Sequence, residues 1–370
     1  MLIRLPNRLT VDVIGKVVLD MQLNTQREDN PMVFALREQV HLVPNQGTLN
    51  PFAGWSPFGI YRRHRNSQIM IDYLGKVLEN RFAEQKSEQS EGKMPRKRTM
   101  IDLALESYRN QTTASQVKVD GLDPDFKKNA ITQIRVFMFA GHDTTSSAIC
   151  YAIYLLQKHP ETLARLRAEH DKVLGPAEGA ADLIRNDPYI INKLEYTNAV
   201  VKEALRLFPA ASGLRTPDRT LVLHDPKTGA HLPTIPGMLL WVNHYGLHRD
   251  RTVWGPNANS FDPARFLPEN AASLPEAHYR PFERGTRSCI GQELAMIEAR
   301  IALALVARKF DFTPAFDALE TLAKDGSKYA ENPKWRQGKQ DLAGEVAYPV
   351  LIGSSKPREG MPMWVKEVGA

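Results

Sequence analysis

Hydrophobic and polar positions alternate at helical spacing through the first half of the chain. Apolar residues recur every three or four positions within Thr10–Met21, about Ser67–Gln85 and about Thr99–Arg109, so we expect a helix in each segment. The Pro- and Gly-rich stretch Asn50–Gly59 breaks the pattern between the first two. The spacing therefore predicts a helical N-terminal half.

A longer apolar segment follows, from Phe126 to Leu156. Asp123 is a good N-cap for it, and Pro124 suits the first helical position. The length predicts a central, largely buried helix. The polar stretch Ala140–Ser146 lies inside this segment, and we expect its Gly, Ser and Thr residues to interrupt the helix because they weaken the backbone hydrogen bonds.

Two shorter helices are predicted next, over Pro160–Leu174 and about Lys193–Phe208. Asn192 and Glu195 have the spacing of a capping box, which predicts how the second of these helices begins.

The pattern then changes from helical to extended. Arg219–His224 and Gly237–Asn243 are predicted strands, and Asp225–Gly229 is a predicted turn. An irregular stretch covers about 248–280, and the tail from about Phe310 predicts loops with short strands. The expected fold class is therefore mainly α with a small β region.

Composition adds few constraints. The chain has 370 residues, 42% hydrophobic and 24% charged, which is typical of a globular protein with a large core. The net charge of +6 is spread along the sequence, and the basic cluster Lys93–Arg98 is better explained as a solvated loop than as a nucleic-acid patch, so we expect no nucleic-acid partner. No apolar stretch reaches the roughly 18 residues of a membrane span.

Only two cysteines are present, Cys150 and Cys289. They exclude a disulfide framework and a four-thiolate zinc or iron–sulfur site, and they indicate a reducing compartment. His244 and His248 are four residues apart, but the flanking pattern is strand and loop and no Glu follows His244, so a zinc helix is not expected.

Cys289 carries the most informative chemistry. It precedes an apolar run at 292–305 that predicts a helix, and the N-terminus of a helix stabilises a thiolate. Gly285 allows a tight turn, Gly291 leaves room for a flat group, and Arg287 supplies a cation. This combination suits the axial ligand of a haem whose propionate needs a partner. Alone, such a cysteine is more often a small buried hydrophobe.

Glu203 and Arg206 lie three residues apart on one helical face, in an otherwise apolar segment. A buried ion pair needs further partners, and Arg265, in the sequence Pro-Ala-Arg-Phe about sixty residues later, offers one.

Asp143 and Thr144 form a second chemical centre. An acid beside a hydroxyl in a buried helix can relay protons, since the hydroxyl both donates and accepts. The alternative is a hydroxyl that bonds back to a carbonyl of its own helix.

The segment Phe282-Glu-Arg-Gly-Thr-Arg-Ser-Cys-Ile-Gly291 resembles the haem-binding signature of the cytochromes P450 at every fixed position. Glu203, Arg206 and Arg265 resemble the Glu-x-x-Arg pair of that family and its Pro-x-Arg-Phe companion, which lock the loop beneath the cysteine, and the separations fit. The resemblance implies these cofactor-binding residues: Phe282, Gly285, Arg287, Cys289, Gly291.

Further roles follow from the resemblance. Cys289 is the expected axial ligand of the haem iron, and Asp143 and Thr144 are the expected acid–alcohol pair that delivers protons to bound oxygen. Arg215 is expected to reach a haem propionate, and residues 210–214 to line an apolar cavity.

The resemblance implies one P450 domain over residues 1–370, with four parts along the chain. They are a helical core over about 1–208, a small sheet and meander over about 209–280, the haem-cysteine loop and C-terminal helix over about 281–309, and loops and strands over 310–370.

The implied function is that of a fungal-type monooxygenase of secondary metabolism. Such an enzyme uses haem b (iron protoporphyrin IX) to insert one oxygen atom from O2 into an apolar small molecule, with electrons from an NADPH-dependent flavoprotein P450 reductase. One alternative is a non-catalytic P450 remnant with little haem. Another is a haem-thiolate enzyme that rearranges an oxidised substrate without O2. Asp143 and Thr144 argue against this alternative, because a rearrangement needs no proton relay.

Compared with the family pattern, the chain is expected to be shortened at its N-terminus, beginning near the fifth lettered helix. A full-length relative is expected at the endoplasmic reticulum membrane through an N-terminal anchor. A chain without that anchor is expected in the cytoplasm.

Overall fold

The computed structural model describes most of the chain, namely residues 1–42, 56–90, 99–114, 121–225, 228–318 and 341–369. The chain divides into two compact units. Unit 1 comprises Met1–Ser146 with Val350–Lys356, and unit 2 comprises Ser147–Pro349 with Pro357–Ala370. The predicted break at Asn50–Gly59 lies largely outside the described residues.

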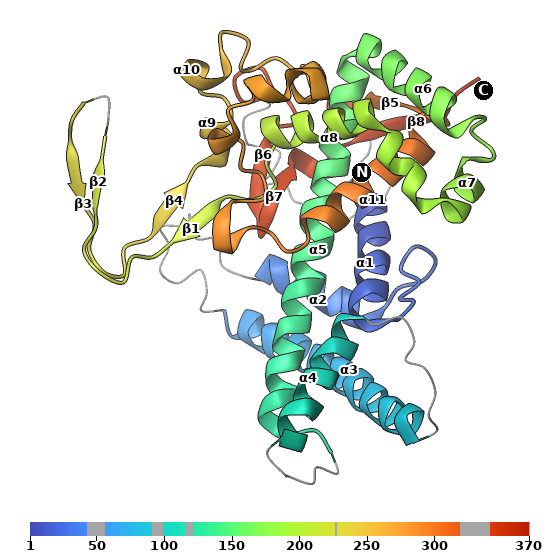
Figure 1. The fold of residues 1–370 in the computed structure, drawn as a ribbon, viewed down its shortest axis with the longest axis vertical. Helices are drawn as coiled ribbons and strands as arrows, with labels where there is room; N and C mark the ends of the chain where they lie inside the picture. Colours follow the sequence, from blue (N-terminus) through green and yellow to red (C-terminus); the bar gives the residue numbers. More distant parts are fainter. Residues whose placement is uncertain (43–55, 91–98, 115–120, 226–227, 319–340, 370) are drawn as a thin grey trace. The chain divides into compact units, whose positions relative to one another are not determined.

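Unit 1 is built of helices, shown in blue to green in Figure 1. Its helices are α1 (Arg4–Leu19), α2 (Pro31–Leu42), α3 (Pro57–Ser90), α4 (Met100–Ala114) and α5 (Pro124–Lys158), the last of which continues into unit 2. Short strands β6 (Pro349–Ile352) and β7 (Ser354–Pro357) pair with each other, and most of their residues belong to this unit.

Helices α1 and α5 cross closely within unit 1. A Cβ placed on Gly141 of α5 would lie 2.7 Å from Cδ1 of Ile14, so only glycine fits the crossing without a shift. The Thr10 hydroxyl of α1 donates to the carbonyl of His142, 2.9 Å away. The polar stretch of α5 is therefore part of a helix–helix contact.

The predicted interruption of α5 is wrong. The helix is continuous from Pro124 to Lys158, because Thr144 and Ser146 direct their hydroxyls to carbonyls of their own helix and leave the backbone hydrogen bonds in place. The predicted beginning is confirmed. Asp123 Oδ1 accepts from the amides of Asp125 and Phe126, at 3.0 and 2.9 Å.

Unit 2 combines helices with short strands. Its α-helices beyond α5 are α6 (Pro160–Leu174), α7 (Ala180–Asn186), α8 (Glu195–Leu207), α9 (His244–Leu247), α10 (Arg251–Trp254) and α11 (Gln292–Val306). Its 3-10 helices are η1 (Pro188–Lys193), η2 (Pro263–Phe266), η3 (Pro268–Ser273), η4 (Glu276–His278), η5 (Gly285–Arg287), η6 (Phe316–Ala318) and η7 (Arg358–Gly360).

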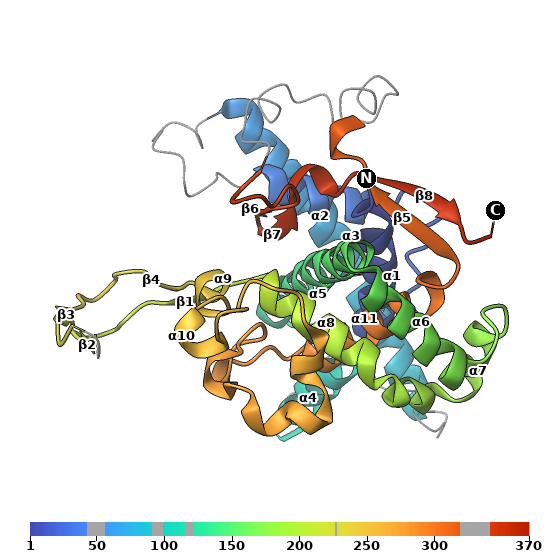
Figure 2. The same ribbon diagram turned by 90° about the horizontal axis from the view of Figure 1, so that it is seen from above.

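The strands of unit 2 form antiparallel two-stranded sheets. They are β1 (Gly213–Arg215) with β4 (Leu240–Val242), β2 (Val222–His224) with β3 (His231–Pro233), and β5 (Phe310–Pro314) with β8 (Met363–Glu367). The first two sheets follow one another along an arm that extends from the unit in both views (Figures 1 and 2). The strands are shorter than predicted, but the mainly helical fold with a small β region is confirmed.

The core of unit 2 holds α11 in place. Ala304 of α11 packs in a buried cluster with Leu174, Ala180, Ile184 and Leu194, which come from α6, α7 and the segment before α8. Burial of this apolar surface stabilises the helix that directly follows Cys289. None of the helices in the described part of the chain combines the length and apolar character that a membrane span requires.

Candidate functional site

The residues Phe282–Gly291, which we call the cysteine loop, lie directly before α11. The Cys289 amide donates to the Phe282 carbonyl at 2.8 Å and so closes the loop. Gly285 has φ of +76°, in the left-handed region that glycine adopts without steric cost, so the predicted tight turn is confirmed. Helix α11 begins at Gln292 with Gly291 as its N-cap, which places Cys289 just before the first helical residue.

The thiol of Cys289 is free and exposed. A Cβ on Gly291 would meet only the Cys289 sulfur, at 3.9 Å, and a Cβ on Gly285 would meet nothing within 4 Å. The next side chain, Ile290, is 82% exposed. The loop therefore presents an exposed sulfur beside two glycines that leave room for a flat group, and these residues fit a thiolate ligand that would hold a haem. Phe282 is half-buried and Arg287 is exposed.

Arg215 lies at the end of β1 and reaches the cysteine loop. Its Nη2 atom is 3.4 Å from Oε2 of Glu283, and its Nη1 atom donates to the carbonyl of Leu214. The guanidinium therefore lies beside the loop, and its contact with a propionate stays a prediction. Glu283 itself was not predicted as a site residue, because the P450 signature leaves that position variable. Of the expected cavity segment, Ala210 is buried and Leu214 is exposed.

Glu203 and Arg206 form a completely buried ion pair in α8. Arg206 binds both carboxylate oxygens of Glu203, from Nε at 2.7 Å and from Nη2 at 2.8 Å. The other three N–H groups donate to the carbonyls of His248, Ala258 and Ser260, at 2.7, 2.6 and 3.0 Å. All five donors of the guanidinium are therefore satisfied, which is what a buried arginine needs.

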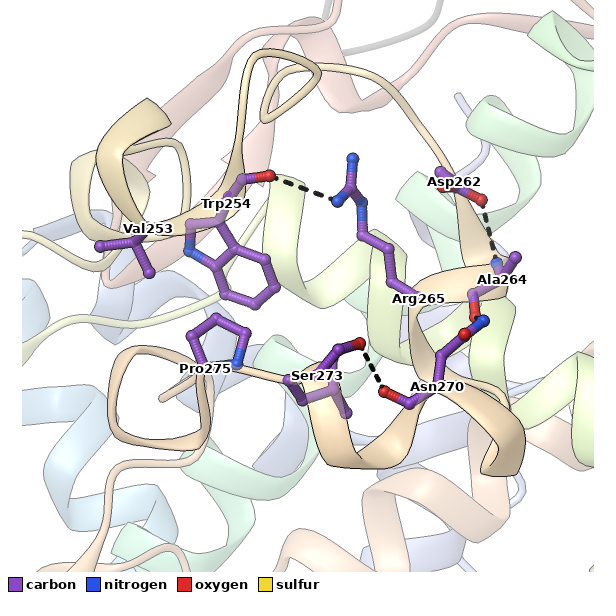
Figure 3. Close-up of a pocket in the computed structure, with 9 residues that line it drawn as sticks. Val253, Trp254, Asp262, Ala264, Arg265, Asn270, Ser273 and Pro275 are labelled. Atoms are coloured by element: carbon purple, nitrogen blue, oxygen red, sulfur yellow. Dashed lines mark hydrogen bonds between the residues drawn. The ribbon is translucent and has the colours of Figure 1, made fainter.

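Arg265 joins the pair as predicted. Its Nε atom lies 3.7 Å from Oε1 of Glu203, and its Nη atoms donate to the carbonyls of Trp254 and Asn257. Arg265 lines a cavity of about 230 Å³. Figure 3 shows it between Trp254 on one side and Asp262 and Asn270 on the other. The cavity is lined by residues between 253 and 275, so it belongs to this structural cluster and not to the cysteine loop.

Electrostatics explain why the cluster needs so many partners. Burial raises the pKa of Glu203 above its ordinary value, while Arg206, the amide of Asp262 and Arg265 act in the opposite direction. The Asp262 amide donates to Oε1 of Glu203 at 2.9 Å. The carboxylate is thus held by one backbone donor and two arginines.

His248 links this cluster to Arg280, two residues before the cysteine loop. Its Nδ1 donates to the Arg206 carbonyl at 3.1 Å, and its Nε2 accepts from the amide of Arg280 at 3.0 Å. One donating and one accepting nitrogen define a neutral ring. Burial, the neighbouring His244 and the cations around it lower the pKa of His248 to about 3. The sequence identified this residue only as part of a zinc-like spacing.

Asp143 and Thr144 lie side by side on α5 but make separate contacts within unit 1. Asp143 is 2% exposed, and its carboxylate accepts from the Ser354 hydroxyl at 2.6 Å and pairs with Nζ of Lys356 at 2.8 Å. The Thr144 hydroxyl donates to the Ala140 carbonyl at 2.9 Å, which is the alternative contact considered from the sequence. Ser354 and Lys356 were not predicted, because they lie more than two hundred residues away in the chain.

Comparison with known proteins agrees with these motifs. The protein-family model described as Cytochrome P450 matches residues 3–332. The cytochrome P450 monooxygenase acrF of Aspergillus aculeatus is 35% identical, over 97% of this chain and 71% of that protein. The cytochrome P450 monooxygenase polC of Polytolypa hystricis is 32% identical, over 97% of this chain and 62% of that protein.

A bacterial relative, the bifunctional cytochrome P450/NADPH–P450 reductase 2 of Bacillus subtilis, is 27% identical over 97% of this chain and 32% of that protein. The chain thus spans between about a third and about seven tenths of the length of these three relatives. Nearly all of it aligns with each of them. The family implies a haem-thiolate cofactor, O2 and a redox partner, and the two fungal relatives are named as monooxygenases, as the sequence predicted. The chain belongs to the cytochrome P450 family.

Proposed function

We propose that this protein is a haem-thiolate monooxygenase that inserts one oxygen atom from O2 into an apolar small molecule. The observation that carries the proposal is the cysteine loop, in which an exposed, free Cys289 thiol faces open space beside Gly291 and directly precedes α11. The names of the relatives support the reaction type. The apolar substrate and a role in fungal secondary metabolism are part of the proposal.

The residues of the cysteine loop hold the cofactor, which we propose to be haem b. Cys289 provides the thiolate that binds the iron, and the loop closed by the Cys289 amide and the Phe282 carbonyl fixes the direction of the sulfur. Gly285 and Gly291 keep side chains away from the ring. Arg215 and Arg287 supply cations for the propionates. When bound, the haem activates O2, and the thiolate favours O–O cleavage.

The role of Asp143 and Thr144 is proton delivery. Lys356 and Ser354 hold the buried Asp143 carboxylate in place, Lys356 by an ion pair to Oδ1 and Ser354 by a hydrogen bond to Oδ2. The Thr144 hydroxyl can both accept and donate a proton. It is free to act as a relay for Asp143 once its hydrogen bond to the Ala140 carbonyl is broken.

Glu203, Arg206 and Arg265 have a structural role in this proposal. Arg206 ties the carbonyls of His248, Ala258 and Ser260 to α8. His248 in turn accepts a hydrogen bond from the amide of Arg280, two residues before Phe282. The cluster therefore fixes the chain that leads into the cysteine loop.

The electrons come, in this proposal, from an NADPH-dependent flavoprotein P450 reductase. The family uses a redox partner, and the mild positive charge of +6 is compatible with an acidic partner. We propose the endoplasmic reticulum membrane as the location of a full-length relative, and no nucleic-acid partner.

Haem content and the absorbance spectrum of the reduced carbon-monoxide complex test the proposal. We expect about one haem per chain and the red-shifted Soret band of a thiolate-ligated haem, and Cys289→Ala should abolish that band. Cys150→Ala is the matched control, since Cys150 is completely buried, and it should keep the band. Wild-type chain without haem would indicate the non-catalytic remnant, and a persistent band in Cys289→Ala would disprove the ligand assignment.

A further inference from the structure

Three basic side chains of unit 2 converge on the carboxylate of Glu283, the second residue of the cysteine loop. His244 of α9 places Nε2 at 2.9 Å from Oε1, and Arg280 places Nη2 at 2.7 Å from Oε2. Arg215 of β1 adds its Nη2 at 3.4 Å from Oε2. The Glu283 side chain is 13% exposed and His244 is buried, so this pair is shielded from water, whereas the side chains of Arg280 and Arg215 are 32% and 43% exposed.

Both ring nitrogens of His244 have a partner. Its Nδ1 lies 3.0 Å from the carbonyl of Ala211, and its Nε2 lies 2.9 Å from Oε1 of Glu283. The residue is 1% exposed, so these contacts replace those that water would make with the ring. The contact with the Glu283 carboxylate ties α9 to the cysteine loop. Burial acts to raise the pKa of Glu283, but hydrogen bonds from Arg280 and His244 lower it overall.

The backbone around Glu283 is adapted to this position. Glu283 has φ of +57°, a conformation that residues other than glycine adopt at a steric cost. A Cβ on Gly213 of β1 would lie 2.0 Å from Oε1 of Glu283, so glycine at this point makes room for the carboxylate. The strained residue thus keeps its conformation while its side chain is held from three directions.

We propose that Glu283 is a positioning residue for Cys289. Its carboxylate anchors the beginning of the cysteine loop to α9 and β1. It also keeps the Arg215 guanidinium beside the loop, where the guanidinium can bind an anionic group of the cofactor. The anchor acts on Cys289 through the backbone, because the Phe282 carbonyl next to Glu283 accepts from the Cys289 amide. The cofactor part of this inference rests on the proposed function, whereas the anchor itself does not.

The anchor can be tested without cofactor. In Glu283→Gln the side chain keeps its size but loses its charge, so we expect hydrogen exchange at the Cys289 amide and alkylation of Cys289 to become about tenfold faster or more. Native alkylation reports Cys289 alone, because Cys150 is 0% exposed. The matched control is Glu293→Gln, the same change at an exposed position of α11, which should leave both rates unchanged.

A second variant reaches the same contact from the other side. Gly213→Ala displaces the carboxylate without changing any charge, so it should accelerate exchange at Cys289 in the same direction. His244→Gln should do the same, and the double variant with Glu283→Gln should add little, since both remove one pair. Unchanged exchange at Cys289 in both Glu283→Gln and Gly213→Ala would overturn the proposal.

Hemin titration provides the second readout. We expect Glu283→Gln to bind hemin about tenfold more weakly than wild type, and to shift its reduced carbon-monoxide spectrum from the thiolate-ligated toward the thiol-ligated form. Equal affinity and an unchanged spectrum would disprove the cofactor part. If wild type itself fails to bind hemin through a thiolate, the proposed function is wrong, while the exchange experiment still decides whether Glu283 anchors the loop.

Discussion

All five N–H groups of Arg206 have acceptors, and this saturation makes the residue difficult to replace. A lysine has a compact ammonium with three donors and cannot make the two-oxygen contact with Glu203. In the buried cluster it would leave backbone carbonyls without donors, at a cost of order 1–3 kcal/mol each. The guanidinium carbon lies over the Trp254 ring, 5.0 Å from its centroid, and an ammonium makes such a contact less well.

We therefore expect Arg206→Lys to lower the free energy of unfolding by about 3–5 kcal/mol, measured by chemical denaturation. The matched control is Arg185→Lys, which changes an arginine three residues after an acid, Asp182, in an exposed pair on α7. That pair should contribute little to stability. Similar losses in both variants would contradict a special role for the buried cluster.

Single residues also show what could be predicted from the sequence. Arg206, Arg265 and Cys289 were predicted because each lies in a short pattern whose chemistry requires that residue type. Glu283 and Lys356 were not predicted. Their roles depend on partners that folding brings together from distant positions, such as His244 for Glu283, and no local pattern marks them.

At the level of elements, a helix cap from an adjacent residue could be predicted, whereas a cap from a residue of another helix could not. Asp123 caps α5 from the adjacent position, as expected. The capping box at Asn192 and Glu195 is wrong, because η1 occupies the preceding residues and α8 begins only at Glu195. The first amides of α8 are instead bound by Glu169 of α6, which accepts from Tyr196 and Thr197 at 2.6 and 2.9 Å.

The crossing of α1 and α5 gives a test at this scale. Gly141 allows Ile14 of α1 to approach α5 closely. This contact lies within one helical turn of Asp143 and Thr144. We expect Gly141→Ala to destabilise unit 1 by about 1–3 kcal/mol, because the added methyl overlaps Ile14, despite the higher helix propensity of alanine. Hydrogen exchange of the α1 and α5 amides would measure the loss.

Two further variants make this test specific. Ile14→Ala should cost less stability in the Gly141→Ala background than in wild type, because it removes the atoms that the new methyl meets. Gly179→Ala adds a methyl where nothing lies within 4 Å and should have little effect. A double variant less stable than the sum of the two single variants would contradict the close-contact explanation.

At the scale of the whole molecule, the sequence predicted the family and the reaction class, because the signature and the paired motifs are specific. It could not predict which ionisable groups become buried, and these determine how stability depends on pH. In unit 2, burial lowers the pKa of His170 to about 4 and, with nearby cations, that of His248 to about 3. Burial raises the pKa of Glu298 to about 8, and its Oε2 has no hydrogen-bond partner among the described residues.

The directions of these pKa shifts predict that the free energy of unfolding of unit 2 has a maximum as a function of pH. The two histidines have folded-state pKa values below the ordinary 6.5, so their contribution to stability is present above pH 6.5 and is lost as the pH falls toward 4. Glu298 has a folded-state pKa above the ordinary 4.5, so its contribution is present below pH 4.5 and is lost as the pH rises to about 8. Each group changes the free energy of unfolding by about 1.4 kcal/mol per pH unit in its window.

Between pH 4.5 and 6.5 two histidines outweigh one carboxyl, and above pH 6.5 only the carboxyl acts, so these three groups give unit 2 its greatest stability near pH 6.5. Hydrogen exchange of the α8 and α11 amides across pH 5 to 8, corrected for intrinsic rates, would measure the curve. Glu298→Gln should remove the decline above pH 6.5, whereas Glu269→Gln, at an exposed position of η3, should keep it. A decline in Glu298→Gln as steep as in wild type would show that another group controls the alkaline side, because a neutral amide cannot lose a proton in this range.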